Sequence, residues 1–302
     1  MPASKPFALV TYAAEGGPRV GVLVAERVAD ATALTGAGTM LALLERWDAA
    51  VPRLAGLAER AAAGAIETRP LAGTRLLAPL PRPANLYCAF ANYVDHMREM
   101  GGTPANPEIE DAFLFQVPAN AVIGPEEPIP APPGVVRLDW EGELGAVIGR
   151  TARDPSPAEA LDCVTGYTIV HDVSIRGAEA RRGDNGGRPD WLAAKGRAGF
   201  KPMGPAIVPA QFVPDPQKLA LRTRVNGVTK QDSNTAQMIY STAQLISHLS
   251  RLCGVVPGDV IATGTPAGVG LPRGEFLKPG DVVEIEIEAI GTLRNPVVRG
   301  GA

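Results

Sequence analysis

The middle of the chain carries the segment Leu138-Asp139-Trp140-Glu141-Gly142-Glu143-Leu144-Gly145-Ala146-Val147-Ile148. Successive side chains of a β-strand point to opposite faces. A strand here would place Glu141 and Glu143 on one face, and Trp140, Leu144 and Ile148 on the other. The segment therefore predicts two carboxylates side by side on an otherwise apolar strand.

The alternation alone does not tell whether this pair is a site or a solvated strand face. Glu284, Glu286 and Glu288 alternate in the same way in Val-Val-Glu-Ile-Glu-Ile-Glu. Charged side chains usually remain in water. Both interpretations of Glu141 and Glu143 therefore stay open at this point.

A third carboxylate, Asp172, lies in Tyr167-Thr-Ile-Val-His-Asp-Val-Ser-Ile175, where uncharged and β-branched neighbours predict burial. An unpaired buried carboxylate costs several kcal/mol, so Asp172 needs a cation such as Arg176 or a metal. If Asp172 meets Glu141 and Glu143, the three would repel one another unless a divalent ion neutralised them. Oxygen-only ligands suit Mg²⁺, Mn²⁺ or Ca²⁺ rather than zinc.

Other strand-like runs cover 85–91, 113–116, 164–175 and 219–225, with two more near the end of the chain. Asn226-Gly227 predicts a two-residue hairpin. A helix is expected around 238–252, with Asn234 or Thr235 as N-cap. The expected fold class is α+β and mainly β.

The first part of the chain predicts a small α+β unit. Residues 7–12 and 19–31 suggest two strands, and apolar spacing at 41–47 and 54–58 suggests helices. From Leu76 the pattern changes to short runs broken by prolines. We therefore expect a small N-terminal domain over 1–75 and a catalytic domain over 76–302.

Composition excludes several classes of function. The chain has 302 residues, 45% hydrophobic and 20% charged, which is typical of a folded globular protein. A net charge of −3 lacks the basic excess of a nucleic-acid-binding protein. The three cysteines are widely spaced, and no segment resembles a signal peptide or membrane span. We expect a cytoplasmic protein with no nucleic-acid or membrane partner.

Two further regions offer chemistry. A helical turn after Tyr93 would stack His96 and Glu99, so that the carboxylate orients a general base; a surface pair is the alternative. His171 and His248 have weaker claims. The glycine-rich turn Gly264–Gly270 would bind a carboxylate through bare amides and the Thr265 hydroxyl, or serve only as a tight turn.

The segment between Gly177 and Lys195 is rich in arginine and glycine, and predicts a mobile loop first and an anion clamp second. Lys195 follows the apolar residues Trp191-Leu-Ala-Ala. An ammonium drawn inward there would stabilise an enolate or oxyanion, whereas a lysine at the surface is the plainer alternative.

Taken together, these segments resemble the fumarylacetoacetate hydrolase family from about Leu76 to Val298. The resemblance is carried by ordered motifs: Cys88-Ala-Phe-Ala-Asn-Tyr-Val-Asp-His96-Met-Arg-Glu99, Asp139-Trp-Glu141-Gly-Glu143-Leu-Gly-Ala-Val-Ile-Gly, Gly166-Tyr-Thr-Ile-Val-His-Asp172-Val-Ser-Ile-Arg176, Lys195, Gly264-Thr265-Pro-Ala-Gly-Val-Gly, and Gly280-Asp-Val-Val-Glu-Ile. Each motif is weak alone, but six in the same order are specific.

The resemblance implies a mixed β-roll or barrel catalytic domain, usually in a homodimer. It implies that Glu141, Glu143 and Asp172 hold Mg²⁺ or Mn²⁺, with Ca²⁺ as a further candidate. His96 and Glu99 would activate water, and Lys195 would contact the substrate oxyanion. The expected substrate-binding residues are Thr265, Gly264, Arg176, Gln116 and Tyr93.

The expected activity is metal-dependent hydrolysis of a C–C bond in an acylpyruvate-like 2,4-dioxo acid, as in aromatic catabolism. Because the same enolate serves other reactions, decarboxylation, isomerisation or hydration of a related 2-oxo acid is the alternative. A binding relative without turnover is a further alternative.

Four positions depart from the family pattern. Phe90 stands where glycine is usual, and Gln116 stands where lysine is common. Gly177 and Glu179 follow Arg176 where an aspartate and a glutamine are commonly found. A lost cation and a gained anion would make the pocket less attractive to a dianionic substrate, so we expect an altered substrate or reaction on a retained metal site.

Overall fold

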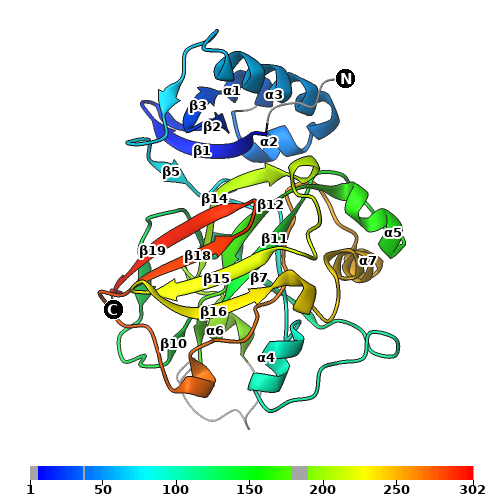
Figure 1. Cartoon of the computed structure of the whole chain (residues 1–302), viewed down its shortest axis with the longest axis vertical. Coiled ribbons are helices and arrows are strands. Elements are labelled where there is room, and N and C mark those ends of the chain that lie inside the picture. Colours follow the sequence, from blue (N-terminus) through cyan, green and yellow to red (C-terminus); the bar gives the residue numbers. More distant parts are fainter. Residues whose placement is uncertain (1–5, 37, 178–189, 302) are drawn as a thin grey trace.

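The computed structural model describes residues 6–36, 38–177 and 190–301. A twelve-stranded sheet and a five-stranded sheet dominate it, with short helices at their edges (Figure 1). The expected α+β, mainly β class is confirmed. The expected barrel is not observed, because both sheets in the described ranges are open strand series. The predicted clamp loop falls mostly on 178–189, outside the described residues.

The N-terminal elements form one end of the large sheet, at the top of Figure 1. Its strands are β1 (Ala8–Ala14), β2 (Gly17–Val24), β3 (Arg27–Asp30) and β4 (Arg69–Pro70), and its helices are α1 (Thr32–Thr35), α2 (Met40–Leu44) and α3 (Trp47–Ala62). The single strand expected over 19–31 is two strands, because Ala25 and Glu26 both adopt positive φ, 48° and 60°, in a tight turn.

The sheet continues from β1 into the part of the chain that carries the motifs. The strand order is β1-β14-β12-β11-β17-β6-β7, with β5 beside β1 and β8 beside β14. These strands are β5 (Leu76–Leu77), β6 (Leu86–Ala89), β7 (Leu114–Val117), β8 (Val122–Ile123), β11 (Gly142–Ile148), β12 (Val164–His171), β14 (Lys201–Pro209) and β17 (Val260–Ala262). Sequence patterns missed β14, whose prolines at 202, 205 and 209 argue against a strand.

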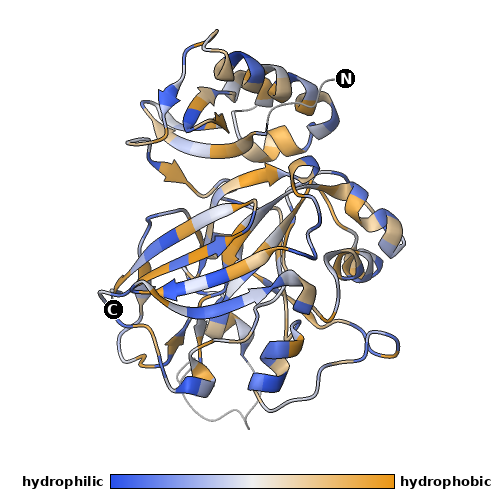
Figure 2. Ribbon diagram, viewed as in Figure 1, coloured by the Kyte–Doolittle hydropathy of each residue, from blue (hydrophilic) through white to orange (hydrophobic). Residues whose placement is uncertain are grey.

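The second sheet has the order β16-β15-β18-β19-β9. Its strands are β9 (Ile129–Ala131), β15 (Ala220–Val225), β16 (Val228–Asn234), β18 (Val282–Ile287) and β19 (Gly291–Arg299), and a short pair joins β10 (Leu138–Asp139) to β13 (Ser174–Ile175). The predicted hairpin is confirmed, since Asn226 and Gly227 take φ of 52° and 77° between β15 and β16. Figure 2 shows apolar and polar residues alternating along β15 and β18, whose apolar side chains face the core.

The described residues after the N-terminal unit form four α-helices: α4 (Val94–Glu99), α5 (Pro157–Ala160), α6 (Trp191–Lys195) and α7 (Thr242–Cys253). The start expected for α7 was wrong. Ser241 caps this helix in a reciprocal pair with Gln244, whereas Asn234 caps the 3₁₀ turn η5 (Thr235–Gln237). Further 3₁₀ turns are η1 (Ala119–Ala121), η2 (Leu161–Cys163), η4 (Ala210–Phe212) and η6 (Leu271–Arg273).

Two larger apolar clusters and a smaller one around Val10 and Tyr12 hold the described layers together. One of the larger clusters joins β11 and β12 to the second sheet and α7. The other larger cluster packs Trp47 and Leu54 of α3 with Val147 of β11 and Val170 of β12. The division at residue 75 stays a prediction. No helix among the described residues is both long and apolar enough to cross a membrane.

Candidate functional site

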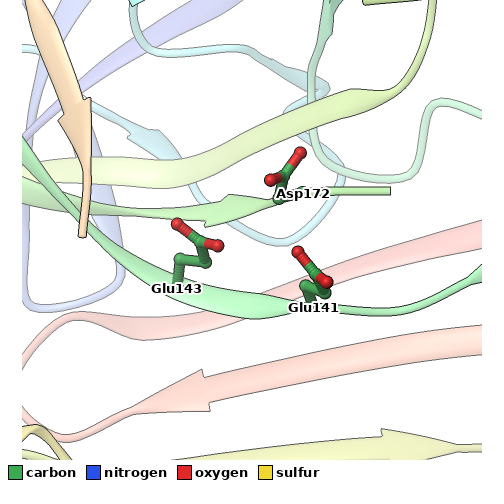
Figure 3. Close-up of side chains that lie close together, drawn as sticks. All are labelled: Glu141, Glu143 and Asp172. Atoms are coloured by element: carbon green, nitrogen blue, oxygen red, sulfur yellow. The ribbon is translucent and has the colours of Figure 1, made fainter. Parts of the chain in front are cut away.

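Three carboxylates meet where β11 begins and β12 ends. Glu143 lies on β11, Glu141 directly precedes that strand, and Asp172 directly follows β12 (Figure 3). The strand register pairs Gly142 with His171, and the Asp172 amide donates to the Glu141 carbonyl at 2.9 Å. One carboxylate oxygen from each residue lies within 4.8 Å of the others, and all three side chains are buried. The antiparallel pairing of β11 with β12 therefore brings Asp172 close to Glu141 and Glu143, which are distant from it in sequence.

Positive charge is distributed unevenly over this cluster. Lys195 Nζ donates to Glu141 Oε2 and Asp172 Oδ2, both at 2.6 Å, and Arg176 Nη2 donates to Glu141 Oε1. Burial alone would raise the pKa of Glu141, but Lys195 and Arg176 lower it overall. Lys195, which sequence left open between surface and site, is therefore turned inward.

Glu143 has no ion-pair partner among the residues that the structure describes. Its Oε2 accepts a hydrogen bond from the Gly264 amide at 2.9 Å. Burial, and then repulsion by Asp172 and Glu141, raise the pKa of Glu143 well above its usual range. A divalent cation would relieve that repulsion, and the oxygen-only donor set suits Mg²⁺ or Mn²⁺. The cluster therefore fits the metal that the sequence suggests.

Two charged residues that sequence analysis missed support the cluster. Asp139 accepts from Arg176 Nε at 2.8 Å and from the amides of Gly270 and Leu271, so it orients the arginine and holds the glycine-rich turn. Lys201 is fully buried, with Nζ 2.6 Å from Asp172 Oδ1. The signals were present: Asp139 adjoins the quoted glutamates, and Lys201 stands alone in the apolar run Phe-Lys-Pro-Met.

His96 and Glu99 share α4, as the spacing predicts, but they are not hydrogen-bonded. His96 Nδ1 lies 3.9 Å from Glu99 Oε2, which instead accepts from the Gly268 amide at 2.8 Å. Burial is the largest cause that lowers the pKa of His96 below its usual 6.5. A neutral imidazole is able to accept a proton near neutral pH.

The glycine-rich turn is tied to the cluster by its own hydrogen bonds. Thr265 Oγ1 donates to the Gly142 carbonyl at 3.0 Å and accepts from Gln231 Nε2 at 2.8 Å. Gly264 has a φ of +92°, and a Cβ there would lie 2.8 Å from Cβ of Asn92. Only glycine therefore lets this turn approach the segment between β6 and α4 so closely.

Three expected substrate-binding residues do not line the cavity over the carboxylates: Gly264, whose amide donates to Glu143, and Gln116 and Tyr93. Gln116 is exposed and donates to Asn85 Oδ1 at 2.8 Å, because alternation along β7 turns Phe115 toward the cavity and Gln116 away. Tyr93 is buried, and its hydroxyl has no hydrogen-bond partner among the described residues. Burial, followed by the charge of Glu143, raises the pKa of the Tyr93 phenol.

The other two histidines lie outside the cavity. His171 is buried, and burial lowers its pKa to about 3, so it is neutral. His248 lies on α7 with Nδ1 3.4 Å from Asp111 Oδ1. This leaves His96 as the histidine that lines the cavity.

One cavity of about 240 Å³ opens over the carboxylates. It brings together most of the residues that the sequence predicts, namely His96, Glu141, Glu143, Arg176, Lys195 and Thr265. A base, two of the three clustered carboxylates and two cations line one small space, which suits chemistry on a small anionic molecule.

Comparison with known proteins agrees with this geometry. The family model for the fumarylacetoacetate hydrolase C-terminal part matches residues 85–298. The chain belongs to the fumarylacetoacetate hydrolase family. A second model, fumarylacetoacetase N-terminal domain 2, matches residues 19–82. Members of this family are enzymes that act on small molecules.

Among similar proteins, the human mitochondrial oxaloacetate tautomerase FAHD2A is 39% identical over 262 residues, covering 86% of this chain and 80% of the relative. A 5-carboxymethyl-2-hydroxymuconate delta-isomerase from Mycobacterium smegmatis superimposes with a TM-score of 0.74 at 33% identity, covering 98% of this chain and 100% of that one. Maleylpyruvate hydrolase from Sphingobium sp. SYK-6, solved with manganese(II) and pyruvate, has a TM-score of 0.78 at 29% identity, covering 97% and 100%. Family members with this fold thus carry out both isomerisation and hydrolysis.

Proposed function

We propose that this protein is a divalent-metal-dependent hydrolase that cleaves a C–C bond in an acylpyruvate-like 2,4-dioxo acid. The observation that carries the proposal is the shared cavity: a neutral His96 and Lys195 both line the space over Glu141 and Glu143. The hydrolase relative solved with manganese and pyruvate is consistent with this chemistry.

The reaction adds one water molecule. The water oxygen forms a bond to C4 of the substrate, the C3–C4 bond breaks, and its electron pair remains on C3 as the pyruvate enolate. The water proton passes to His96 and then to C3, which yields pyruvate and a carboxylic acid. No oxidant or reductant is consumed.

Each residue has a defined part in this scheme. His96 Nδ1 or Nε2 takes the proton, and Glu99 keeps α4 against the glycine-rich turn through the Gly268 amide. An ammonium has three N–H donors, and Glu141 and Asp172 take two from Lys195, which leaves one for the developing enolate oxygen. Glu141, Glu143 and Asp172 would hold the metal, which when bound supplies Lewis acidity toward the 2-oxo acid.

A second candidate is proton transfer without cleavage, that is, tautomerisation or isomerisation of a 2-oxo acid. The same base and the same oxyanion donor would serve it. The tautomerase and isomerase relatives favour this candidate. Decarboxylation would use the same enolate.

The homodimer and the cytoplasmic location expected from the sequence stay predictions. The human relative is named as mitochondrial, so the compartment differs within the family. Gel filtration with light scattering would decide the oligomeric state.

The test is turnover by metal-stripped protein, with and without added Mg²⁺ or Mn²⁺. Acetylpyruvate, fumarylpyruvate and oxaloacetate are the substrates, and loss of enol absorbance and release of pyruvate are followed separately. Metal-dependent pyruvate release from a diketo acid supports the hydrolase. Enol loss without pyruvate supports the tautomerase, and pyruvate from oxaloacetate alone supports the decarboxylase.

A further inference from the structure

The residues that line the cavity over the carboxylates are of two chemical kinds. The polar part of the lining has His96, Arg176 and Lys195 beside the carboxylates. The apolar part has Phe90, Met97, Met100, Phe115 and Trp191. The cavity volume of about 240 Å³ lies below the roughly 300–1,000 Å³ of typical ligand pockets, so the occupant is small.

Four rings form what we call the aromatic wall: Phe90, Phe113, Phe115 and Trp191. Phe90 meets Trp191 edge to face with centroids 5.1 Å apart, and Phe115 stacks on Trp191 at 5.0 Å. Phe113 meets Phe90 edge to face at 5.7 Å. These mutual contacts fix the rings before any ligand binds, which lowers the entropic cost of binding.

The wall is assembled from three separate segments. Phe90 follows β6, Phe113 and Phe115 lie at and on β7, and Trp191 begins α6. Phe90 is 49% exposed and Phe113 is 52% exposed. Grouped exposed aromatic surface beside a reactive centre is typical of a binding site, because covering it is favourable.

Lys195 Nζ lies 5.9 Å from the centroid of the Phe115 ring, where the apolar and polar parts of the lining meet, and Glu141 and Asp172 hold it there by hydrogen bonds. The cations of the lining are Arg176 and Lys195, and both are already paired with carboxylates. Gln116 faces away from the cavity and donates to Asn85. A carboxylate against the apolar part of the lining would lose its hydration without gaining a partner.

We propose that the aromatic wall selects 2-oxo acids whose distal group is apolar, such as an aryl or branched alkyl acyl group, over those that end in a second carboxylate. This inference rests on the proposed function, because the 2-oxo acid end must lie at the carboxylate cluster. It assigns Phe90, Phe115 and Trp191 as specificity-determining residues.

The first test compares kcat/KM for benzoylpyruvate and fumarylpyruvate, which share the pyruvate end and differ in the distal group. We expect benzoylpyruvate to be favoured by roughly tenfold or more, the range set by apolar contacts in a pocket. Equal values, or a preference for fumarylpyruvate, would overturn the assignment even though the hydrolase itself would stand.

The second test introduces a positive charge into the aromatic wall. Phe90→Lys should lower the benzoylpyruvate-to-fumarylpyruvate ratio by roughly tenfold or more, since it removes a ring and adds a cation. Leu192→Ala is the matched control: Leu192 is 61% exposed on the same helix as Trp191 and does not line the cavity. If Phe90→Lys does not fold, Phe90→Ala should lower kcat/KM for benzoylpyruvate while sparing acetylpyruvate; an unchanged ratio in the folded variant would contradict the proposal.

A binding experiment separates this inference from the proposed reaction. Calorimetry on the Mg²⁺- or Mn²⁺-loaded protein would compare 5-methyl-2-oxohexanoate with 2-oxoglutarate, in which a carboxylate replaces the isopropyl group. Tighter binding of the apolar acid by roughly tenfold supports the wall even if no diketo acid is cleaved. Tighter binding of 2-oxoglutarate would refute it whatever the reaction.

Discussion

The same alternation of glutamates occurs twice in this chain with opposite results. Glu141 and Glu143 are buried at the start of β11, whereas Glu284 and Glu286 on β18 have side chains 32% and 47% exposed. Arg224 Nη2 lies 2.9 Å from Glu286 Oε2, and Arg294 Nε lies 3.7 Å from Glu284 Oε1, both near the surface. A period of two thus decides that two carboxylates share a face, but not what covers that face.

The elements that cover Glu141 and Glu143 are distant from them in sequence. β11 lies between β12 and β17 inside the large sheet, and the glycine-rich turn after β17 reaches Glu143 through the Gly264 amide. β18 lies between β15 and β19, whose neighbouring residues offer arginines at the surface. The physical difference is desolvation: the buried pair needs a cation, and the exposed pair has water.

The largest expected difference between the two regions is in metal binding. Glu143→Ala should abolish Mg²⁺ and Mn²⁺ binding and lower turnover by about 10³-fold or more, because the ion supplies several kcal/mol of transition-state stabilisation. Calorimetry and a pyruvate assay would measure both. Glu286→Ala, the matched change on β18, should leave both unchanged; retained metal binding in Glu143→Ala would refute the metal assignment.

The next effect concerns the base above the buried pair. His96→Ala should lower hydrolysis by about 10²- to 10⁴-fold, the usual contribution of a general base, while metal affinity is kept. His248→Ala, on the rim of α7, is the control. Full hydrolysis without His96 would remove it from the mechanism.

A third comparison is of ion pairs. Lys201→Met leaves Asp172 with one buried cation fewer, so unfolding free energy should fall by about 3 kcal/mol or more in metal-free protein. Arg224→Met breaks an exposed pair and should cost about 1 kcal/mol or less. Urea denaturation of both variants would measure this, and similar losses would show that burial does not separate the two regions.

The smallest expected effect is on the pH profile. Since burial lowers the pKa of His96, its neutral form persists below pH 6.5, and kcat/KM should fall only as the pH drops through that lower value. A pH–rate profile would show the acid limb below 6.5. A fall in kcat/KM that is centred above pH 6.5 would contradict a buried, neutral His96 as the base.

Much of the fold follows from local patterns, and the site follows less directly. The hairpin at Asn226-Gly227 and the side-by-side placement of Glu141 and Glu143 follow from local patterns, and the structure has both. The sequence did not predict β14, because its prolines disfavour a strand. Pairing with β12 nevertheless forms the strand. Lys201, Asp139 and the direction of Gln116 depend on register and on partners far along the chain, which local periodicity does not encode.

The pairing of β1 with β14 links the first strand of the chain to the strand that begins at Lys201. Deleting the residues before Leu76 would uncover β14 around Ile207, which pairs with Leu9, whereas Lys201 and Pro202 would stay paired with β8. An uncovered strand edge recruits strands from other molecules. The N-terminal elements therefore cover backbone that would otherwise promote self-association. Light scattering of a fragment covering 76–302 should reveal aggregates that the full chain does not form.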